Sequence, residues 1–396
     1  MNPLCILIAS DTYYPQIDGT SYFTQRLAAG LAAKGHHVHV VCPADTILKD
    51  VVIRHGASLH PMPSFLTPFH PTQRVCLSSV IKRLAAQLVQ ELSPDVIHVQ
   101  GHFPICRTLI QIARRLDIPL IATNHFMPQN LVPYYLFPEW CRGRVESTAW
   151  RDLVRWFRYP QIVTTPTDTA AQVLWSHGVN RPVTVISGGV DTHRFVPADI
   201  SSTEARRRLN LANRATILYV GRLSADKGIS DLIEALPIVR QRVDAQLIIA
   251  GRGVRAKMLL RHCHTLGVAQ YVNFLGFVPN AEIPRVYMAA DVFCMPGRAE
   301  LQSLATLEAL STALPVIAAD AVALPHLVIN GVNGFLYEPR DICTLSKHIC
   351  SVLEAPRLRQ TLGQASRQIA LSHDIGLTVE QYEQTYNAAV SGKERS

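Results

Sequence analysis

The chain has 396 residues, of which 48% are hydrophobic and 17% are charged, so intrinsic disorder is excluded and two or three domains are expected. Its formal net charge of +8 suits phosphates or an anionic membrane surface without naming a ligand. No stretch reaches the roughly 18 apolar residues of a membrane-spanning helix, and the nine scattered cysteines, without a C-x-x-C pair, are expected to be reduced thiols of a cytoplasmic protein.

Apolar runs rich in Val and Ile alternate with helical segments along the chain, which is typical of buried parallel strands. In the first half a helix is predicted over 21–34, and strands are predicted at Leu4–Ala9, His37–Cys42, Val96–Val99, Leu120–Thr123 and Ile162–Thr165. The second half repeats the pattern, with strands predicted at Thr216–Val220, Gln246–Ala250, Val272–Phe274, Val292–Met295 and Val316–Ala318.

This repetition predicts an α/β protein of two doubly wound, Rossmann-like domains that face each other across a cleft. The first domain is expected over residues 1–186 and the second over 214–375. Residues 187–213, which contain glycines and a proline, are expected to form a linker with a short helix. Ligands of such folds bind at the carboxyl ends of the strands.

A glycine-bounded loop with two cations follows the strand predicted at Thr216–Val220. It reads Gly221-Arg-Leu-Ser-Ala-Asp-Lys227-Gly228 and opens a helix near Ile229. Gly221 permits a tight turn, and Arg222 and Lys227 add positive charge beside the backbone amides of a helix N-terminus. The combination suits a diphosphate, and the alternative is a pair of solvated cations beside a turn.

Two glutamates flank the start of another predicted helix. Ser303 is expected to be its N-cap, with Glu300 in the loop ahead of it. At about 1.5 Å per residue, Glu308 lies roughly 7–8 Å further along the axis, which is about the distance from a diphosphate at the helix end to its ribose. A carboxylate accepts hydrogen bonds from ribose hydroxyls well, and the alternative is a pair of solvated glutamates.

Three further features are individually weaker. Gly251-Arg-Gly-Val-Arg-Ala256 matches the G-x-G-x-x-A dinucleotide fingerprint, but the expected acid about 20 residues later is missing, so a tight, closely packed turn is preferred. Gly19, next to Asp18 in the first β-α loop, permits close backbone approach to a ligand. His125 directly follows the strand at Leu120–Thr123, at the edge where ligands bind, although a lone histidine is more often structural.

In this order the motifs resemble retaining glycosyltransferases of the GT-B architecture, specifically glycosyltransferase family 4, over almost the whole chain. The specific marks are the G-R-x-x-x-x-K-G loop at 221–228 and the E-x7-E element at 300–308. Gly189-Val-Asp191, Arg194-Phe195 and Asn333-Gly-Phe335, the last taken to follow the sixth strand, support it. The resemblance also implies a final helix, about 378–389 within a segment 376–396, that packs back on the first domain.

The resemblance implies a role for each site residue. Arg222 and Lys227 would hold the diphosphate of a UDP- or GDP-linked sugar. Glu308 would bind its ribose, and Glu300 would contact the hydroxyls of the donor sugar. Three more residues of the same two motifs would belong to the nucleotide-sugar site: Gly221, Ser303 and Leu304. Two residues of the first half would complete it, with Gly19 near the phosphates and His125 on the donor-sugar side of the cleft.

The two cations would stabilise the leaving phosphate without a metal, and no D-x-D motif that could hold one occurs. No other cofactor is expected. Departures from the family pattern, such as Gln302-Ser303 where many relatives have Phe-Gly or Gln-Gly, leave the donor sugar open.

A lipid or glycolipid acceptor is favoured, because the segments 123–126 and 299–303 resemble those of glycolipid-making enzymes. The amphipathic helices predicted at 78–92 and 140–160 carry basic residues and tryptophans, which suits a peripheral site at the inner face of the cell membrane. A core-facing helix with solvated arginines is the alternative for 140–160. Other functions left open are transfer to a soluble sugar or inositol, epimerisation of a sugar nucleotide, NAD-dependent oxidoreduction and nucleotide binding without catalysis. Nucleic-acid binding is not expected, because the basic residues are dispersed.

Overall fold

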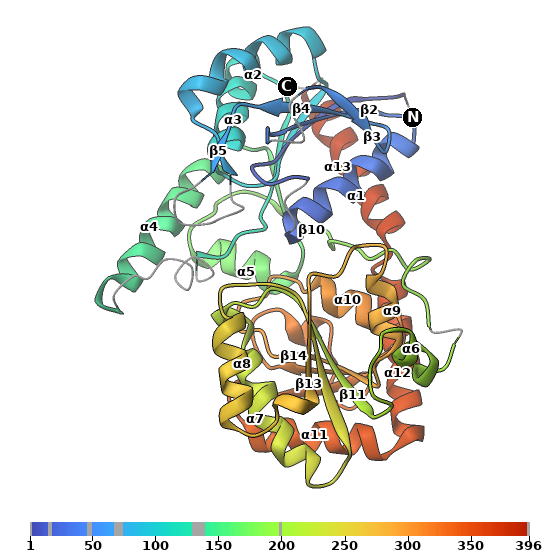
Figure 1. Ribbon diagram of the computed structural model, residues 1–396. Coiled ribbons are helices and arrows are strands. Elements are labelled where there is room, and N and C mark those ends of the chain that lie inside the picture. Colours follow the sequence, from blue (N-terminus) through green and yellow to red (C-terminus); the bar gives the residue numbers. More distant parts are fainter. Residues whose placement is uncertain are drawn as a thin grey trace. The chain divides into compact units, whose positions relative to one another are not determined.

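The computed structural model describes residues 2–14, 18–45, 50–66, 74–128, 139–197 and 200–393. The chain divides into two compact units (Figure 1). The first comprises Met1–Gly188 together with Ile375–Ser396, and the second comprises Gly189–Asp374. From Gly189 on, the segment predicted as a linker lies with the second unit, where Phe195 is buried in the core.

The first unit is built on an eight-stranded sheet with the order β10-β9-β8-β7-β1-β2-β4-β3. Every neighbouring pair is parallel except β3 and β4. The strands are β1 (Cys5–Ala9), β2 (His37–Pro43), β3 (Val52–Arg54), β4 (Ala57–Met62), β7 (Val96–Val99), β8 (Leu120–Thr123), β9 (Ile162–Thr165) and β10 (Val183–Val185), beside a separate antiparallel pair, β5 (Phe65–Leu66) and β6 (Arg74–Val75).

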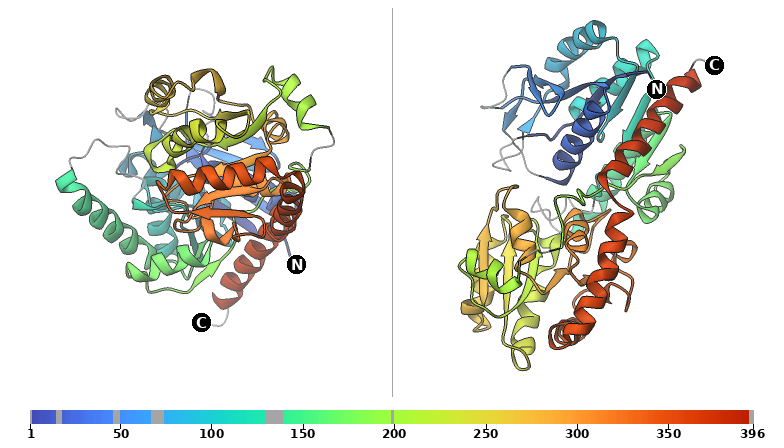
Figure 2. Two further views of the ribbon diagram at one scale, coloured as in Figure 1. Left: turned by 90° about the horizontal axis from the view of Figure 1, so that it is seen from below. Right: turned by 90° about the vertical axis from the view of Figure 1, so that its right-hand side faces the viewer.

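Helices cover both faces of this sheet. They are α1 (Gly19–Ala33), α2 (Ser78–Leu92), α3 (Pro104–Leu116), α4 (Glu139–Phe157), α5 (Asp168–Ser176) and α13 (Ile375–Lys393). One core cluster joins the sheet to α2, α3 and α4, and another joins it to α1 and α13. Although α13 comes last in the sequence, it packs against α1 in the first unit (Figure 2).

The amphipathic pattern of α4 is explained by the core. Trp150, Leu153 and Phe157 are all buried against the sheet, at 5% exposure or less. The core-facing alternative is therefore correct for this part of α4, and the ring of Trp150 is not available to a membrane surface. Trp140, at the other end of the helix, is 78% exposed.

The second unit contains a six-stranded parallel sheet with the order β13-β12-β11-β14-β15-β16. Its strands are β11 (Ala215–Val220), β12 (Ala245–Ala250), β13 (Val272–Gly276), β14 (Val292–Met295), β15 (Val316–Ala319) and β16 (Gly334–Tyr337). Its helices are α6 (Ser202–Arg208), α7 (Ile229–Arg240), α8 (Ala256–Thr265), α9 (Ile283–Met288), α10 (Leu304–Ser311), α11 (Ile342–Glu354) and α12 (Pro356–Leu371), with short 3₁₀ turns η2 (Ala225–Lys227), η3 (Ala269–Tyr271) and η4 (Leu324–His326).

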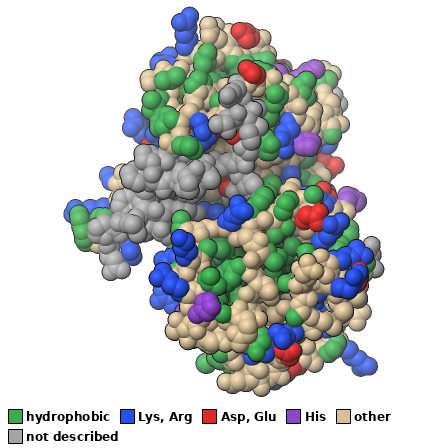
Figure 3. Space-filling model, in the orientation of Figure 1, with side chains coloured by type: hydrophobic (Ala, Val, Ile, Leu, Met, Phe, Trp, Pro, Cys, Tyr) green, Lys and Arg blue, Asp and Glu red, His purple; other side chains and the backbone are tan. Residues whose placement is uncertain are grey.

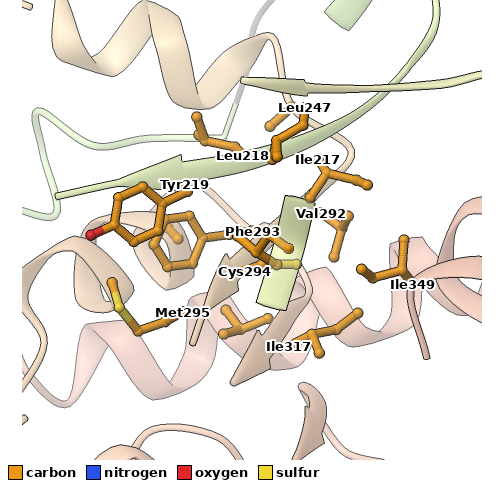
Figure 4. Close-up of a cluster of buried hydrophobic side chains, with 14 of the residues drawn as sticks. Ile217, Leu218, Tyr219, Leu247, Val292, Phe293, Cys294, Met295, Ile317 and Ile349 are labelled. Carbon is orange, nitrogen blue, oxygen red and sulfur yellow. The ribbon is translucent and has the colours of Figure 1, made fainter. Parts of the chain in front are cut away.

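The centre of the second unit is an apolar cluster from the middle strands of this sheet (Figure 4). Tyr219 packs its ring into this cluster while its hydroxyl points away from it. The predicted doubly wound α/β class is confirmed. One detail of the prediction is wrong, because Asn333-Gly-Phe335 lies at the start of the sixth strand, β16, and not after it.

Candidate functional site

The loop between β11 and α7 carries the two predicted cations. Gly228 ends η2 with a φ of 61°, in the left-handed region, and a Cβ at this position would lie 2.2 Å from the carbonyl oxygen of Pro296. Only glycine fits such a backbone approach. The loop is therefore seated directly against the segment that follows β14, which leads to Glu300.

Lys227 and Glu300 meet across these two segments. The ammonium of Lys227 donates a hydrogen bond to Oε1 of Glu300. Both side chains are largely buried, whereas the Arg222 side chain is 43% exposed. Asp226 lies between the cations, with its carboxylate 3.8 Å from Nη2 of Arg222 and 3.9 Å from Nζ of Lys227. The loop thus presents two cations beside two carboxylates.

Residues that sequence reasoning missed brace this loop. The buried hydroxyl of Tyr219 donates to the carbonyl oxygen of Arg222 at 2.8 Å. Arg298 binds the carboxylate of Asp231 with Nη2, at 2.8 and 3.1 Å, and its backbone N–H donates to the carbonyl oxygen of Asp226 at 2.9 Å. These contacts fix the position of the loop through its backbone.

The E-x7-E element forms the start of α10. The prediction that Ser303 is the N-cap is confirmed, since its hydroxyl accepts a hydrogen bond from the backbone N–H of Thr306. Leu304 is the first residue of the helix, so Glu308 lies one turn further along. Tyr287 of α9 donates its hydroxyl proton to Oε2 of Glu308 at 2.8 Å. Burial and the nearby carboxylate keep the pKa of Tyr287 well above its ordinary value, so its hydroxyl stays a donor.

The glycines of the fingerprint-like turn have a packing role. A Cβ on Gly251 would lie 1.8 Å from the carbonyl oxygen of Gly221, and one on Gly253 would lie 2.3 Å from that of Leu223. In addition, Leu223 N–H donates to the carbonyl oxygen of Arg252 at 2.9 Å. The turn at 251–253 therefore packs directly against the backbone of the cation-bearing loop. This agrees with the interpretation of the motif as a tight, closely packed turn.

In the first unit, His125 ends a buried hydrogen-bond network. Its Nε2 lies 2.7 Å from Oε1 of Gln100, and Nε2 of Gln100 lies 3.2 Å from the ring nitrogens of His98. His98 continues the network to Thr123 at 2.6 Å and to the hydroxyl of Tyr386 in α13 at 2.7 Å. The last helix of the chain is thus connected to His125 through side chains of β7 and β8.

This network determines the protonation state of His125 and which of its ring nitrogens carries the proton. Burial lowers its pKa to about 3, so the ring is neutral at pH 7. Because the amide oxygen of Gln100 can only accept, Nε2 of His125 carries the proton and Nδ1 is an acceptor. The ring also lies against Phe23, with the two centroids 4.8 Å apart.

Gly19 is the first residue of α1, four residues before Phe23. Asp18 caps the helix by accepting the backbone N–H of Ser21 at 2.8 Å. The exposed Gly19 therefore lies at a helix N-terminus, and residues 15–17, just ahead of it, are outside the described residues.

The predicted site residues thus form two groups. In the second unit the structure brings together Gly221, Arg222, Lys227, Glu300, Ser303, Leu304 and Glu308. In the first unit Gly19 and Phe23 both belong to α1, and the ring of Phe23 lies against His125. No group of three or more His, Cys, Asp or Glu side chains suited to a metal ion occurs within the part of the chain that the structure describes.

Comparisons with known proteins identify both halves. A family profile described as "Glycosyltransferase Family 4" matches residues 17–194, and one described as "Glycosyl transferases group 1" matches residues 201–369. The chain belongs to the GT-B glycosyltransferases. Solved structures show the same fold for this glycosyltransferase. Sucrose-phosphate synthase from Thermosynechococcus elongatus has a TM-score of 0.81 at 20% identity, over 98% of this chain and 99% of that one. Anabaena HepE with UDP-glucose has a TM-score of 0.80 at 21% identity, over 97% and 99%.

Relatives of this glycosyltransferase with similar sequences have names that specify different products or substrates. An alpha-monoglucosyldiacylglycerol synthase of Acholeplasma laidlawii is 25% identical over 90% of each chain. A GDP-mannose-dependent phosphatidylinositol monomannoside mannosyltransferase of Mycolicibacterium smegmatis is 34% identical over 47% of this chain and 50% of the relative. A glycogen synthase of Mycobacterium tuberculosis is 28% identical over 98% of this chain and 95% of the relative.

Proposed function

We propose that this glycosyltransferase moves a hexose from a UDP- or GDP-linked sugar to a lipid or glycolipid acceptor, with retention at the anomeric carbon. The observation that carries the proposal is the contact between Lys227 and Glu300, beside Arg222 and at the start of α10. It joins the two motifs that suit a nucleotide sugar, although 73 residues separate the two side chains in the sequence.

Charge explains how these residues would act. Cleavage of the bond from the anomeric carbon to the diphosphate leaves negative charge on the phosphate. Arg222 and Lys227 lie on a loop braced by Tyr219, so the cations are held in place before that charge develops. Glu300, held by Lys227, would accept hydrogen bonds from hydroxyls of the donor sugar. Because the cations serve this purpose, we propose transfer that needs no metal.

Glu308 is proposed to bind the ribose. Tyr287 fixes one carboxylate oxygen and stays protonated, so Glu308 is held as an acceptor in one orientation. Two neighbouring ribose hydroxyls are donors that such a carboxylate can bind.

Gly19 and His125 of the first unit are further proposed as residues that bind the donor. Nδ1 of the neutral His125 is an acceptor for a sugar hydroxyl. Helix α1 begins at Gly19, and the N-terminus of a helix attracts phosphate. For the chemical step we propose attack of the acceptor from the side of the leaving phosphate, which itself takes the acceptor proton. Accumulation of a covalent glycosyl-enzyme in a slowed variant, detected by mass spectrometry, would contradict this mechanism.

A lipid acceptor is supported by relatives whose names contain diacylglycerol and phosphatidylinositol lipids. It is also supported by the surface of α2, where Leu77, Val80 and Leu84 are between 43% and 52% exposed and lie next to the exposed Lys82 and Arg83. Figure 3 shows hydrophobic side chains among Lys and Arg at the surface of this region. Such a surface suits peripheral contact with an anionic bilayer.

No helix within the described residues is long and apolar enough to cross a membrane. The proposed contact with the bilayer is therefore tested on α2. In a sedimentation assay with vesicles of phosphatidylglycerol and phosphatidylcholine, V80D/L84D should lose binding. Leu371→Asp, which changes an equally exposed leucine of α12, should keep it.

A soluble glucan acceptor is the second candidate, favoured by the glycogen synthase match over nearly the full chain. One experiment separates the candidates. Purified protein is incubated with UDP-, GDP- and ADP-sugars, together with a lipid extract or maltooligosaccharides, and the products are analysed by mass spectrometry. A glycolipid is expected from one donor, and Lys227→Ala and Glu308→Ala should each reduce its formation strongly. Transfer to the oligosaccharide alone, without vesicle binding, would overturn the lipid assignment, and unchanged transfer by both variants would overturn the donor site.

A further inference from the structure

Asp226 is an unusual residue at the centre of the loop that carries the two cations. Its side chain is only 3% exposed. Within the described part of the chain, neither oxygen of its carboxylate has a hydrogen-bond partner. Its nearest counter-charges are Arg222 and Lys227, at 3.8 and 3.9 Å, which is within ion-pair range but beyond hydrogen-bond distance.

A buried carboxylate in this position needs a reason. A buried charge without hydrogen bonds is unfavourable unless nearby opposite charges offset it. Here the same two cations do so, and Lys227 is shared with Glu300 as well. Without a ligand, the positive charges of the loop are therefore matched by two carboxylates.

The carboxylate is not what holds the loop in shape. The backbone carbonyl oxygen of Asp226 accepts the N–H of Arg298, and the carbonyl oxygen of Arg222 accepts the hydroxyl of Tyr219. Glycines at 228, 251 and 253 let neighbouring backbone pack against the loop and the turn beneath it. None of these contacts involves the Asp226 side chain, so asparagine at this position should leave the fold intact.

We propose that Asp226 is an electrostatic counterweight that weakens the binding of the diphosphate and so promotes release of the nucleoside diphosphate product. The proposal rests on the proposed function, in which Arg222 and Lys227 bind that diphosphate. When a diphosphate binds Arg222 and Lys227, these cations no longer neutralise Asp226 alone. The Asp226 carboxylate then lies close to a second anion in a poorly solvated site. Like charges in such a site repel strongly. The repulsion acts on donor and product alike, and it matters most for the product, which carries the larger negative charge once the sugar has left.

The test measures nucleotide affinity directly. UDP, GDP and inorganic pyrophosphate are titrated into purified Asp226→Asn by calorimetry, without donor sugar or acceptor. The nucleotide that the wild type prefers should bind about tenfold more tightly to this variant, and pyrophosphate should gain by a similar factor, since the effect acts on the diphosphate. Steady-state assays should show correspondingly stronger product inhibition. Asp226→Ala should behave likewise, whereas Asp226→Glu, which keeps the charge, should bind within about twofold of the wild type.

The controls separate this inference from the donor site itself. Asp244→Asn removes an exposed carboxylate of the same unit and should leave nucleotide affinity unchanged. Loss of nucleotide binding in Lys227→Ala, together with unchanged or weaker binding in both neutral variants of Asp226, would overturn the counterweight and leave the donor site standing. Unchanged nucleotide binding in Lys227→Ala would overturn the donor site, and the counterweight with it.

Discussion

Removing a single hydroxyl group tests the site assigned to the nucleotide. In Tyr287→Phe the aromatic ring, which is fully buried beside Phe195 and Phe293, keeps its packing. What disappears is the hydrogen bond to Glu308 at 2.8 Å and the weaker one to the carbonyl oxygen of Ala305 at 3.1 Å. Any effect can therefore be attributed to these polar contacts.

The structure sets the expected size of the effect. A hydrogen bond to a charged group contributes about 1.5–3 kcal/mol to stability. Glu308 is only half-buried, so water can replace the phenol, and a loss of about 1.5 kcal/mol in the free energy of unfolding is expected. Glu308 also loses the hydrogen bond that orients one of its carboxylate oxygens, which should raise the KM for the nucleotide sugar about fivefold to tenfold, since tenfold corresponds to about 1.4 kcal/mol. The kcat should change little, because the ribose is remote from the reacting atoms.

Urea unfolding followed by circular dichroism gives the stability, and initial rates at varied donor concentration give KM and kcat. Tyr271→Phe is the matched control, because its hydroxyl makes no hydrogen bond to the described residues and its ring stacks on Arg240. If Tyr287→Phe matched this control in both the free energy of unfolding and the donor KM, the role assigned to Glu308 would be wrong.

Three further predictions concern backbone, network and pH. Gly228→Ala should lower the free energy of unfolding by about 3 kcal/mol, because the new Cβ meets both a left-handed backbone and the carbonyl oxygen of Pro296. Gly267→Ala, with a φ of 67° and no atom within 4 Å of the added Cβ, should lower it by only about 1 kcal/mol in the same urea experiment. Gln100→Leu should lower kcat/KM about tenfold by removing the acceptor for His125, and Gln100→Glu, which still accepts, should recover most of it in the same rate assay. Burial lowers the pKa of His98 to about 3, so below pH 6.5 the unfolded chain binds a proton there that the folded chain does not. The free energy of unfolding should therefore fall as the pH drops from 6.5 toward 4, and the urea midpoint of His98→Gln should fall less steeply than that of the wild type. Equal slopes of urea midpoint against pH for the two proteins would refute this role of His98.

The sequence predicted those parts of the fold whose pattern is unambiguous. Strand β14 was predicted to the residue, because a fully buried parallel strand is a continuous apolar run that stops at polar or turn-forming residues, here Asp291 and Pro296. β4 was missed, since His60 and Pro61 interrupt its apolar pattern although the strand pairs in parallel with β2. The three-residue β10 was missed because it is too short to show any period.

The same distinction holds for the site. Arg222 and Lys227 could be predicted because a charged pair between glycines at a strand end is conspicuous. Tyr219 and Tyr287, which hold the loop and Glu308, could not, since a buried tyrosine looks in sequence like any other core aromatic. Asp226 was passed over for a related reason: its isolation from hydrogen-bond donors exists only in three dimensions.

The discontinuous make-up of the first unit has a consequence for synthesis. The second unit is one continuous stretch of chain, so its sheet can form as soon as that stretch has left the ribosome. The first unit must wait for α13, because Tyr382 and Tyr386 fill its core and Tyr386 completes the hydrogen bonds of His98. Domains usually fold in the order in which they are made. Here the half that is translated first is expected to be finished last, and a released chain that ends at Asp374 should contain a protease-resistant second unit and a protease-sensitive first unit.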